Sequence, residues 1–139
     1  MTVLAGGPQT LIDETSPLMS SYAGRIFRMG EYGSASVVKI ITNMLAGAHM
    51  VLAGEATMLA KKHNIDLSAY FDGVRNSAGN SYVFETETPL IFNGTYEPGF
   101  TIDLHTKDLN IGHQLSKQGE CPLPMFELSE NIYRRCMAK

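Results

Sequence analysis

Two polar residues interrupt a long apolar stretch, and their spacing would place them on the same helix face. Lys39 lies between Val38 and Ile40, and Asn43 follows four residues later. At about 100° per residue, Asn43 falls within about 40° of Lys39 around a helix. A lysine here can give or take a proton, and an amide one turn away can hydrogen-bond the reacting molecule. The alternative is a lysine whose stem packs on the apolar face while its ammonium reaches solvent.

Two glycines extend this helix face. Gly47 and Gly54 lie within about 80° of Lys39 around the helix. A glycine inside a helix costs about 1 kcal/mol relative to alanine. Two glycines on one face therefore indicate a cleft, or a place where another chain segment packs closely.

A second lysine lies in a later amphipathic segment. Lys107 is within about 80° of each residue of the stripe Leu104, Ile111 and Leu115, and Asp108 follows it. A lysine at the edge of such a stripe suits a flexible arm over a ligand, or an ion pair with a neighbour. The alternative is an exposed lysine with a packed stem.

The remaining reactive residue types predict no metal or phosphate site. His105 and His113 are too far apart in sequence to bind one metal as neighbours on a helix do. We interpret all four histidines as ordinary core or surface residues, and Cys121 and Cys136 as free thiols of a reducing compartment. No Gly-x-Gly-x-x-Gly loop and no P-loop occurs in the sequence.

The elements that position these residues change type near Ser34. Before it, we predict strands over 2–5 and 25–29, separated by a helix over 9–22 that Pro17 bends or divides. A strand, helix and strand within about 30 residues form a βαβ unit with parallel strands. After it, we predict only helices, over 34–63, 66–75, 81–92, 101–118 and 125–137, with the third interrupted or bent near Pro89. The fold class is therefore mainly α.

Composition excludes several classes of protein. Of the 139 residues, 44% are hydrophobic and 18% are charged, which is typical of a folded chain rather than a disordered one. The net charge of −3 gives no basic surface for nucleic acid. The apolar part of the helix over 34–63 is too short and too polar for a membrane span, which favours a helix buried in a soluble bundle.

The first lysine belongs to a longer motif. The pattern Gly30-x-x-Gly33-x-Ala35-x-x-x-Lys39-x-x-x-Asn43 resembles the catalytic signature of the β-hydroxyacid dehydrogenases, with Ala35 in place of a third glycine. These enzymes include 3-hydroxyisobutyrate dehydrogenase and tartronate semialdehyde reductase, and are distantly similar to 6-phosphogluconate dehydrogenase.

A second motif surrounds the second lysine. The pattern Phe100-x-x-x-Leu104-x-x-Lys107-Asp108-Leu109 resembles the other signature of the family, at the expected separation from the first. The Asn-Ser-Ala-Gly-Asn-Ser stretch over 76–81 is most similar to the threonate dehydrogenase-like branch.

The resemblance implies a role for each motif residue. Lys39 would exchange the proton of the substrate hydroxyl while hydride moves between the substrate and NAD or NADP. Asn43 would hydrogen-bond the substrate. Lys107, Asp108 and Phe100 would lie at the nicotinamide end of the cofactor. The remaining assignments are Asn76 and Asn80 as substrate-specificity residues, and Gly30 and Gly33 as an interdomain hinge.

The resemblance also implies how the chain is organised. Residues 1–30 would be the last part of an N-terminal Rossmann domain, and 31–139 an all-α C-terminal domain for catalysis and dimerisation. The expected nucleotide loop is absent, so we expect the chain to begin late in that domain and to be inactive alone. The expected partners are a small hydroxy acid and a second copy of the chain, without nucleic acid or membrane, in the cytoplasm. The alternative function is a non-enzymatic helical dimerisation module.

Overall fold

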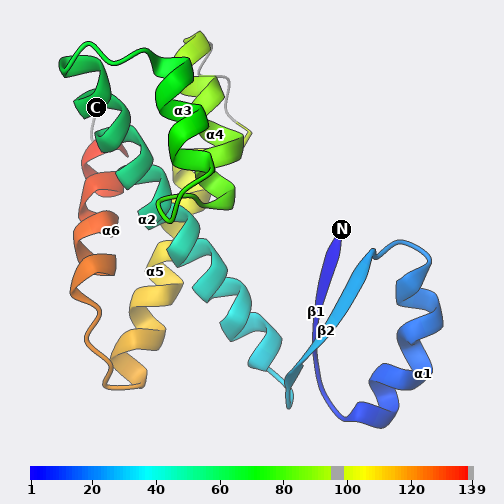
Figure 1. Ribbon diagram of the computed structural model, residues 1–139. Coiled ribbons are helices and arrows are strands. Elements are labelled where there is room, and N and C mark those ends of the chain that lie inside the picture. The colour runs from blue at the N-terminus through cyan, green and yellow to red at the C-terminus, as the bar shows by residue number, and fades with distance from the viewer. Residues whose placement is uncertain (95–98, 138–139) are drawn as a thin grey trace. The chain divides into compact units, whose positions relative to one another are not determined.

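The computed structural model describes residues 1–94 and 99–137. Within them the chain forms two strands and six helices, and it divides into two compact units, Met1–Asn43 and Met44–Lys139. We describe each unit by itself (Figure 1).

The first unit contains the predicted βαβ arrangement. Strand β1 (Thr2–Gly6) pairs in parallel with β2 (Arg25–Gly30), and α1 (Gln9–Ser20) connects them. The register breaks between Ala5 and Gly6, where Gly6 pairs with Gly30. The backbone N–H of Gly7 then donates to the carbonyl of Gly30 at 2.8 Å and closes the end of the ladder.

The predicted division of the first helix at a proline is wrong. Helix α1 runs without interruption through Pro17. Proline removes one backbone donor, but its fixed φ is compatible with a helix. The hydroxyls of Thr15 and Ser16 donate to the carbonyls of Leu11 and Ile12, at 2.7 and 2.8 Å, and so add hydrogen bonds to the preceding turn.

Helix α2 (Ser34–Lys62) continues from the first unit into the second. Shortly after its end, Asn64 has a φ of 55°, the left-handed conformation that commonly ends a helix. Contrary to the prediction that this segment is too short and too polar, α2 in the described part of the chain is long and apolar enough to cross a membrane, a property that the core helix of a soluble protein shares. Only 11% of the most apolar 18-residue stretch of α2 is buried, so α2 is less covered within the chain than we predicted.

Four further helices complete the second unit. Their bounds are Leu67–Arg75 for α3, Tyr82–Asn93 for α4, Ile102–Gln118 for α5 and Pro124–Met137 for α6. Asp66 caps α3 by accepting from the N–H of Ala69 at 2.9 Å, and Ser81 caps α4 by accepting from the N–H of Phe84 at 3.0 Å. Contrary to the prediction, α4 is not interrupted at Pro89.

The core of the second unit has two parts. Rings from α3 and α4 form one part, in which Phe71 stacks on Phe84 at 5.5 Å and Tyr70 meets Phe84 edge-on at 5.7 Å. In the other part α5 packs beside α6 (Figure 1), with Leu109 fully buried and Phe126 buried. The predicted mainly α fold class is therefore confirmed.

Candidate active site

The structure joins the first predicted pair directly. The ammonium Nζ of Lys39 donates to Oδ1 of Asn43 at 2.8 Å, across one turn of α2. Lys39 is exposed and Asn43 is half-buried. An ammonium has three N–H donors, so this bond leaves two with which Lys39 can meet an incoming oxygen. The pair therefore presents a held lysine and an amide on one face of the helix.

The loop before α2 depends on two glycines. Gly30 has a φ of 130° and Gly33 a φ of 89°, values that residues with a side chain rarely adopt. Directly after Gly33, the hydroxyl of Ser34 donates to the carbonyl of Glu31 at 2.6 Å, which tightens the entry into α2. These conformations explain why glycines occur at the two positions. The hinge role assigned to them remains a prediction.

The second lysine is paired with its sequence neighbour. Nζ of Lys107 lies 3.3 Å from Oδ1 of Asp108, and the side chains are 65% and 17% exposed. Helix α5 therefore carries a largely buried carboxylate that tethers an exposed ammonium. Phe100 precedes the helix, is 54% exposed, and meets the ring of His105 edge-on at 5.6 Å.

The two predicted specificity residues differ in their surroundings. Asn76 ends α3 and its amide donates to the carbonyl of Asp72 at 2.8 Å. Asn80 donates to Glu85 Oε1 at 2.7 Å. Asn80 also lines a cavity of about 430 Å³, to which Asn76 does not contribute. The other cavity walls include His49, Ala53, Ala56, Tyr70 and Phe84.

The predicted site residues thus fall into separate groups. Lys39, Asn43 and the two loop glycines belong to the first unit. Phe100, Lys107 and Asp108 belong to the second unit, as do Asn76 and Asn80. Within the described ranges, no group of three or more His, Cys, Asp or Glu side chains could hold a metal ion.

Sequence reasoning missed a buried cluster on the second unit. His105 is 8% exposed, and its ring lies 4.7 Å from that of Tyr133. Burial lowers the pKa of His105 from its ordinary 6.5, and the nearby Asp108 carboxylate opposes that shift. Burial raises the pKa of Tyr133 to about 12. The one available signal was Gly47, the glycine against which His105 packs.

Comparison with known proteins identifies the family. Residues 33–139 match the family model described as the NAD-binding domain of NADP-dependent 3-hydroxyisobutyrate dehydrogenase. The chain therefore belongs to the 3-hydroxyisobutyrate dehydrogenase family, which confirms the resemblance stated above. The expected cofactor class, NAD or NADP, agrees with the family description.

Individual relatives agree with this assignment. The chain is 36% identical to the L-threonate dehydrogenase of Escherichia coli K12 over 96% of its own length and 44% of the relative. It is 29% identical to the 2-(hydroxymethyl)glutarate dehydrogenase of Eubacterium barkeri over 96% and 44%. The crystal structure of 3-hydroxyisobutyrate dehydrogenase from Salmonella typhimurium superimposes with a TM-score of 0.86 at 30% identity, covering 96% of this chain and 47% of that one. The chain spans less than half the length of these curated relatives.

Phe100, just before α5, and Lys107, on α5, offer chemistry that would suit the nicotinamide end of such a cofactor. Phe100 offers an exposed ring face for stacking, and Lys107 an exposed cation held by Asp108. A flat heteroaromatic ring and its carboxamide are the kind of group that this combination can contact. The second motif therefore presents suitable chemistry for the cofactor.

Proposed function

We propose that the complete protein is an NAD(P)-dependent dehydrogenase of small hydroxy acids, and that this chain is its C-terminal part. The observation that carries the proposal is the hydrogen bond between Lys39 and Asn43 on an exposed helix face. Family membership supports the same reaction class.

Proton transfer is the role proposed for Lys39. The nicotinamide, when bound, accepts or supplies the hydride at the hydroxyl-bearing carbon. Oxidation of that carbon also releases the hydroxyl proton, and a neutral lysine amine near the oxygen would accept it. In the reverse reaction the ammonium would return the proton to the carbonyl oxygen.

Positioning of the substrate is the role proposed for Asn43. Its amide holds Nζ of Lys39 at 2.8 Å and would share the same substrate oxygen with it. Placing the proton-transfer group and the hydroxyl together in this way removes entropy cost from the transition state. The shared oxygen would be a hydroxyl close to a carboxylate, the feature common to threonate, 2-(hydroxymethyl)glutarate and 3-hydroxyisobutyrate.

Cofactor contact is the role proposed for Phe100 and Lys107, with Asp108 fixing the lysine. We further propose that Asn80 contributes to substrate specificity, because it lines a cavity. Asn76 is a weaker candidate, because its amide is used to end α3.

The domain assignments belong to the same proposal. Residues 1–30 would complete the sheet of a Rossmann domain, and 31–139 would form the catalytic helical domain. Large apolar side chains of α2 are exposed, namely Ile41, Leu45, Leu52, Met58 and Leu59. This surface supports association of two copies through α2. The complete enzyme would act in the cytoplasm.

The direct test is Lys39→Ala in the complete protein, assayed with a panel of hydroxy acids and both cofactors. We expect turnover to fall by about 10²- to 10⁴-fold, the usual contribution of a positioned acid–base group. Cofactor affinity should stay within severalfold of the wild-type value. The matched control is Lys62→Ala, which removes a lysine from the last turn of the same helix. Turnover near the wild-type value in the Lys39 variant would refute the assignment.

A non-enzymatic module is the second candidate, and the exposed apolar side chains of α2 favour it. A dimerisation module would associate in sedimentation experiments, and the complete protein would oxidise none of the acids in the panel. As a separate expectation, the isolated 139 residues should bind no NADH by calorimetry. Tight binding would show that the nucleotide site lies within this chain.

A further inference from the structure

Gly47 of α2 lies where two other helices approach. A Cβ atom built on Gly47 would clash with Nε2 of His105, closer than real Cβ contacts allow, and would lie 3.4 Å from a methyl of Leu109. Any side chain at position 47 would therefore displace the imidazole. The glycine lets the imidazole of His105 lie directly against the backbone of α2. This close contact explains why a residue that is unfavourable in helices occurs at position 47.

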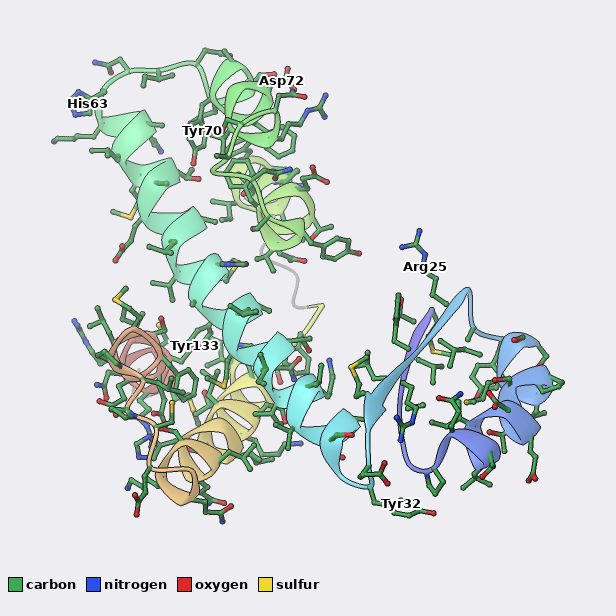
Figure 2. All side chains as sticks on the ribbon, turned by 60° about the horizontal axis from the view of Figure 1, so that its bottom comes forward. Arg25, Tyr32, His63, Tyr70, Asp72 and Tyr133 are labelled. Carbon is green, nitrogen blue, oxygen red and sulfur yellow. The ribbon has the colours of Figure 1, made fainter. Side chains whose placement is uncertain are left out.

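Tyr133 of α6 completes the contact from the other side. Its side chain points from α6 toward α2 (Figure 2), and its hydroxyl donates to the carbonyl of Gly47 at 3.3 Å. Its ring lies 4.7 Å from that of His105. One residue from each of three helices thus meets at a single point, which we call the Gly47 cluster: Gly47, His105 and Tyr133.

Among the described residues, the burial of His105 is not compensated by a hydrogen bond at its Nε2 atom, which has no partner. A buried polar atom without a partner destabilises the folded state, because it has lost its hydrogen bonds to water. The His105 ring contacts two other aromatic rings. One is that of Tyr133, and the other is that of Phe100, which it meets edge-on at 5.6 Å. The imidazole of His105 thus lies between the Gly47 backbone and the Phe100 ring.

We propose that the Gly47 cluster is a positioning device that sets Phe100 and α5 for the cofactor. This inference rests on the proposed function, in which Phe100 and Lys107 contact the nicotinamide end. His105 packs against Phe100 and shares α5 with Lys107. A displaced imidazole would therefore shift both cofactor-facing side chains, Phe100 and Lys107. None of the three cluster residues needs to touch the cofactor.

The test is Gly47→Ala in the complete protein, with cofactor Kd measured by titrating NADH or NADPH fluorescence, a readout that needs no turnover. The added methyl must move His105, and with it the Phe100 ring that would stack on the nicotinamide. We expect Kd to rise by up to about tenfold, the effect of losing one aromatic stacking contact. The double variant Gly47→Ala with His105→Ala removes the clash, and Kd should return toward that of His105→Ala alone.

Gly54→Ala is the matched control, because a Cβ there meets nothing within 4 Å in the described part of the chain. Its Kd should equal the wild-type value. Tyr133→Phe is a milder second variant that keeps the ring and removes only the bond to the Gly47 carbonyl, and we expect Kd to rise about twofold.

Three results separate the possibilities. A folded Gly47→Ala variant with lowered thermal stability but wild-type Kd would overturn the positioning role. An increased Kd that His105→Ala fails to relieve would also overturn it, because the clash would not be the cause. A wild-type complete protein that binds neither cofactor would overturn the proposed function together with this inference.

Discussion

The two units of the chain bury their apolar residues to very different extents. Among the described residues of the first unit, Ile12 is the one buried hydrophobic side chain, while Leu18 is 71% exposed. The second unit buries Leu109 completely and has Phe84 and Phe126 at 3% and 6% exposure. Hydrophobic stabilisation scales with the apolar area removed from water, so most of it should come from the second unit.

Because of this difference, the proposed proton-transfer residue and the main hydrophobic core lie in different units. The proposed proton-transfer residue, Lys39, belongs to the unit with the smaller core, whereas the proposed cofactor residues rest on the better-packed one. Variants of buried residues in the second unit should therefore change the unfolding transition most, and variants of the exposed apolar residues of the first should hardly move it.

The largest expected effect comes from the centre of the second unit. Leu109→Ala should lower the free energy of unfolding by about 2–5 kcal/mol, because it removes a fully buried side chain and leaves a cavity. Thermal unfolding followed by circular dichroism measures the change. Leu18→Ala in α1 is the control, with an expected change within about 0.5 kcal/mol because Leu18 is exposed. Equal losses in the two variants would contradict the comparison.

A smaller effect should appear as a pH dependence. Burial lowers the pKa of His105 below its ordinary 6.5, so the unfolded chain binds the proton first as the pH falls. The stability associated with His105 is therefore complete above pH 6.5 and is lost below it. Chemical denaturation at several pH values should show a steeper acid loss in the wild type than in His105→Gln, which cannot titrate. Parallel pH profiles would mean that His105 does not stay neutral on folding.

The smallest expected effect distinguishes the two glycines of α2. Gly54→Ala should raise the free energy of unfolding by up to about 1 kcal/mol, since alanine favours the helix and meets no neighbour within 4 Å. Gly47→Ala should instead lower it, because its methyl meets His105. A pair of melting curves checks the sign, and a shift in the same direction for both would remove the argument for close packing at Gly47.

Most of the helices could be predicted from the sequence because their signals are local. The capping residues Asp66 and Ser81 each accept a hydrogen bond from a backbone N–H three residues later in the chain. The same locality explains the errors at Pro17 and Pro89. A proline shows where one backbone donor is missing, but it does not show which nearby hydroxyls or packing contacts keep the helix continuous.

The candidate site, like the helices, was predictable only where its contacts are local in sequence. The Lys39–Asn43 contact spans one helical turn, so residue spacing alone predicts it. The Gly47 cluster does not have this property, because Tyr133 lies 86 residues from Gly47 in sequence. The residue pattern showed an unusual glycine on the α2 face, but which side chain it accommodates depends on tertiary packing.

The short parallel sheet of the first unit has a practical consequence. As described, it consists of β1 and β2 alone, so the outer side of each strand carries unpaired backbone N–H and C=O groups. Such edges bind other strands readily, including those of identical molecules. The chain prepared alone should therefore aggregate through strand addition at concentrations where the helical unit stays dissolved, and a lysine or proline placed on either outer edge would improve its solubility.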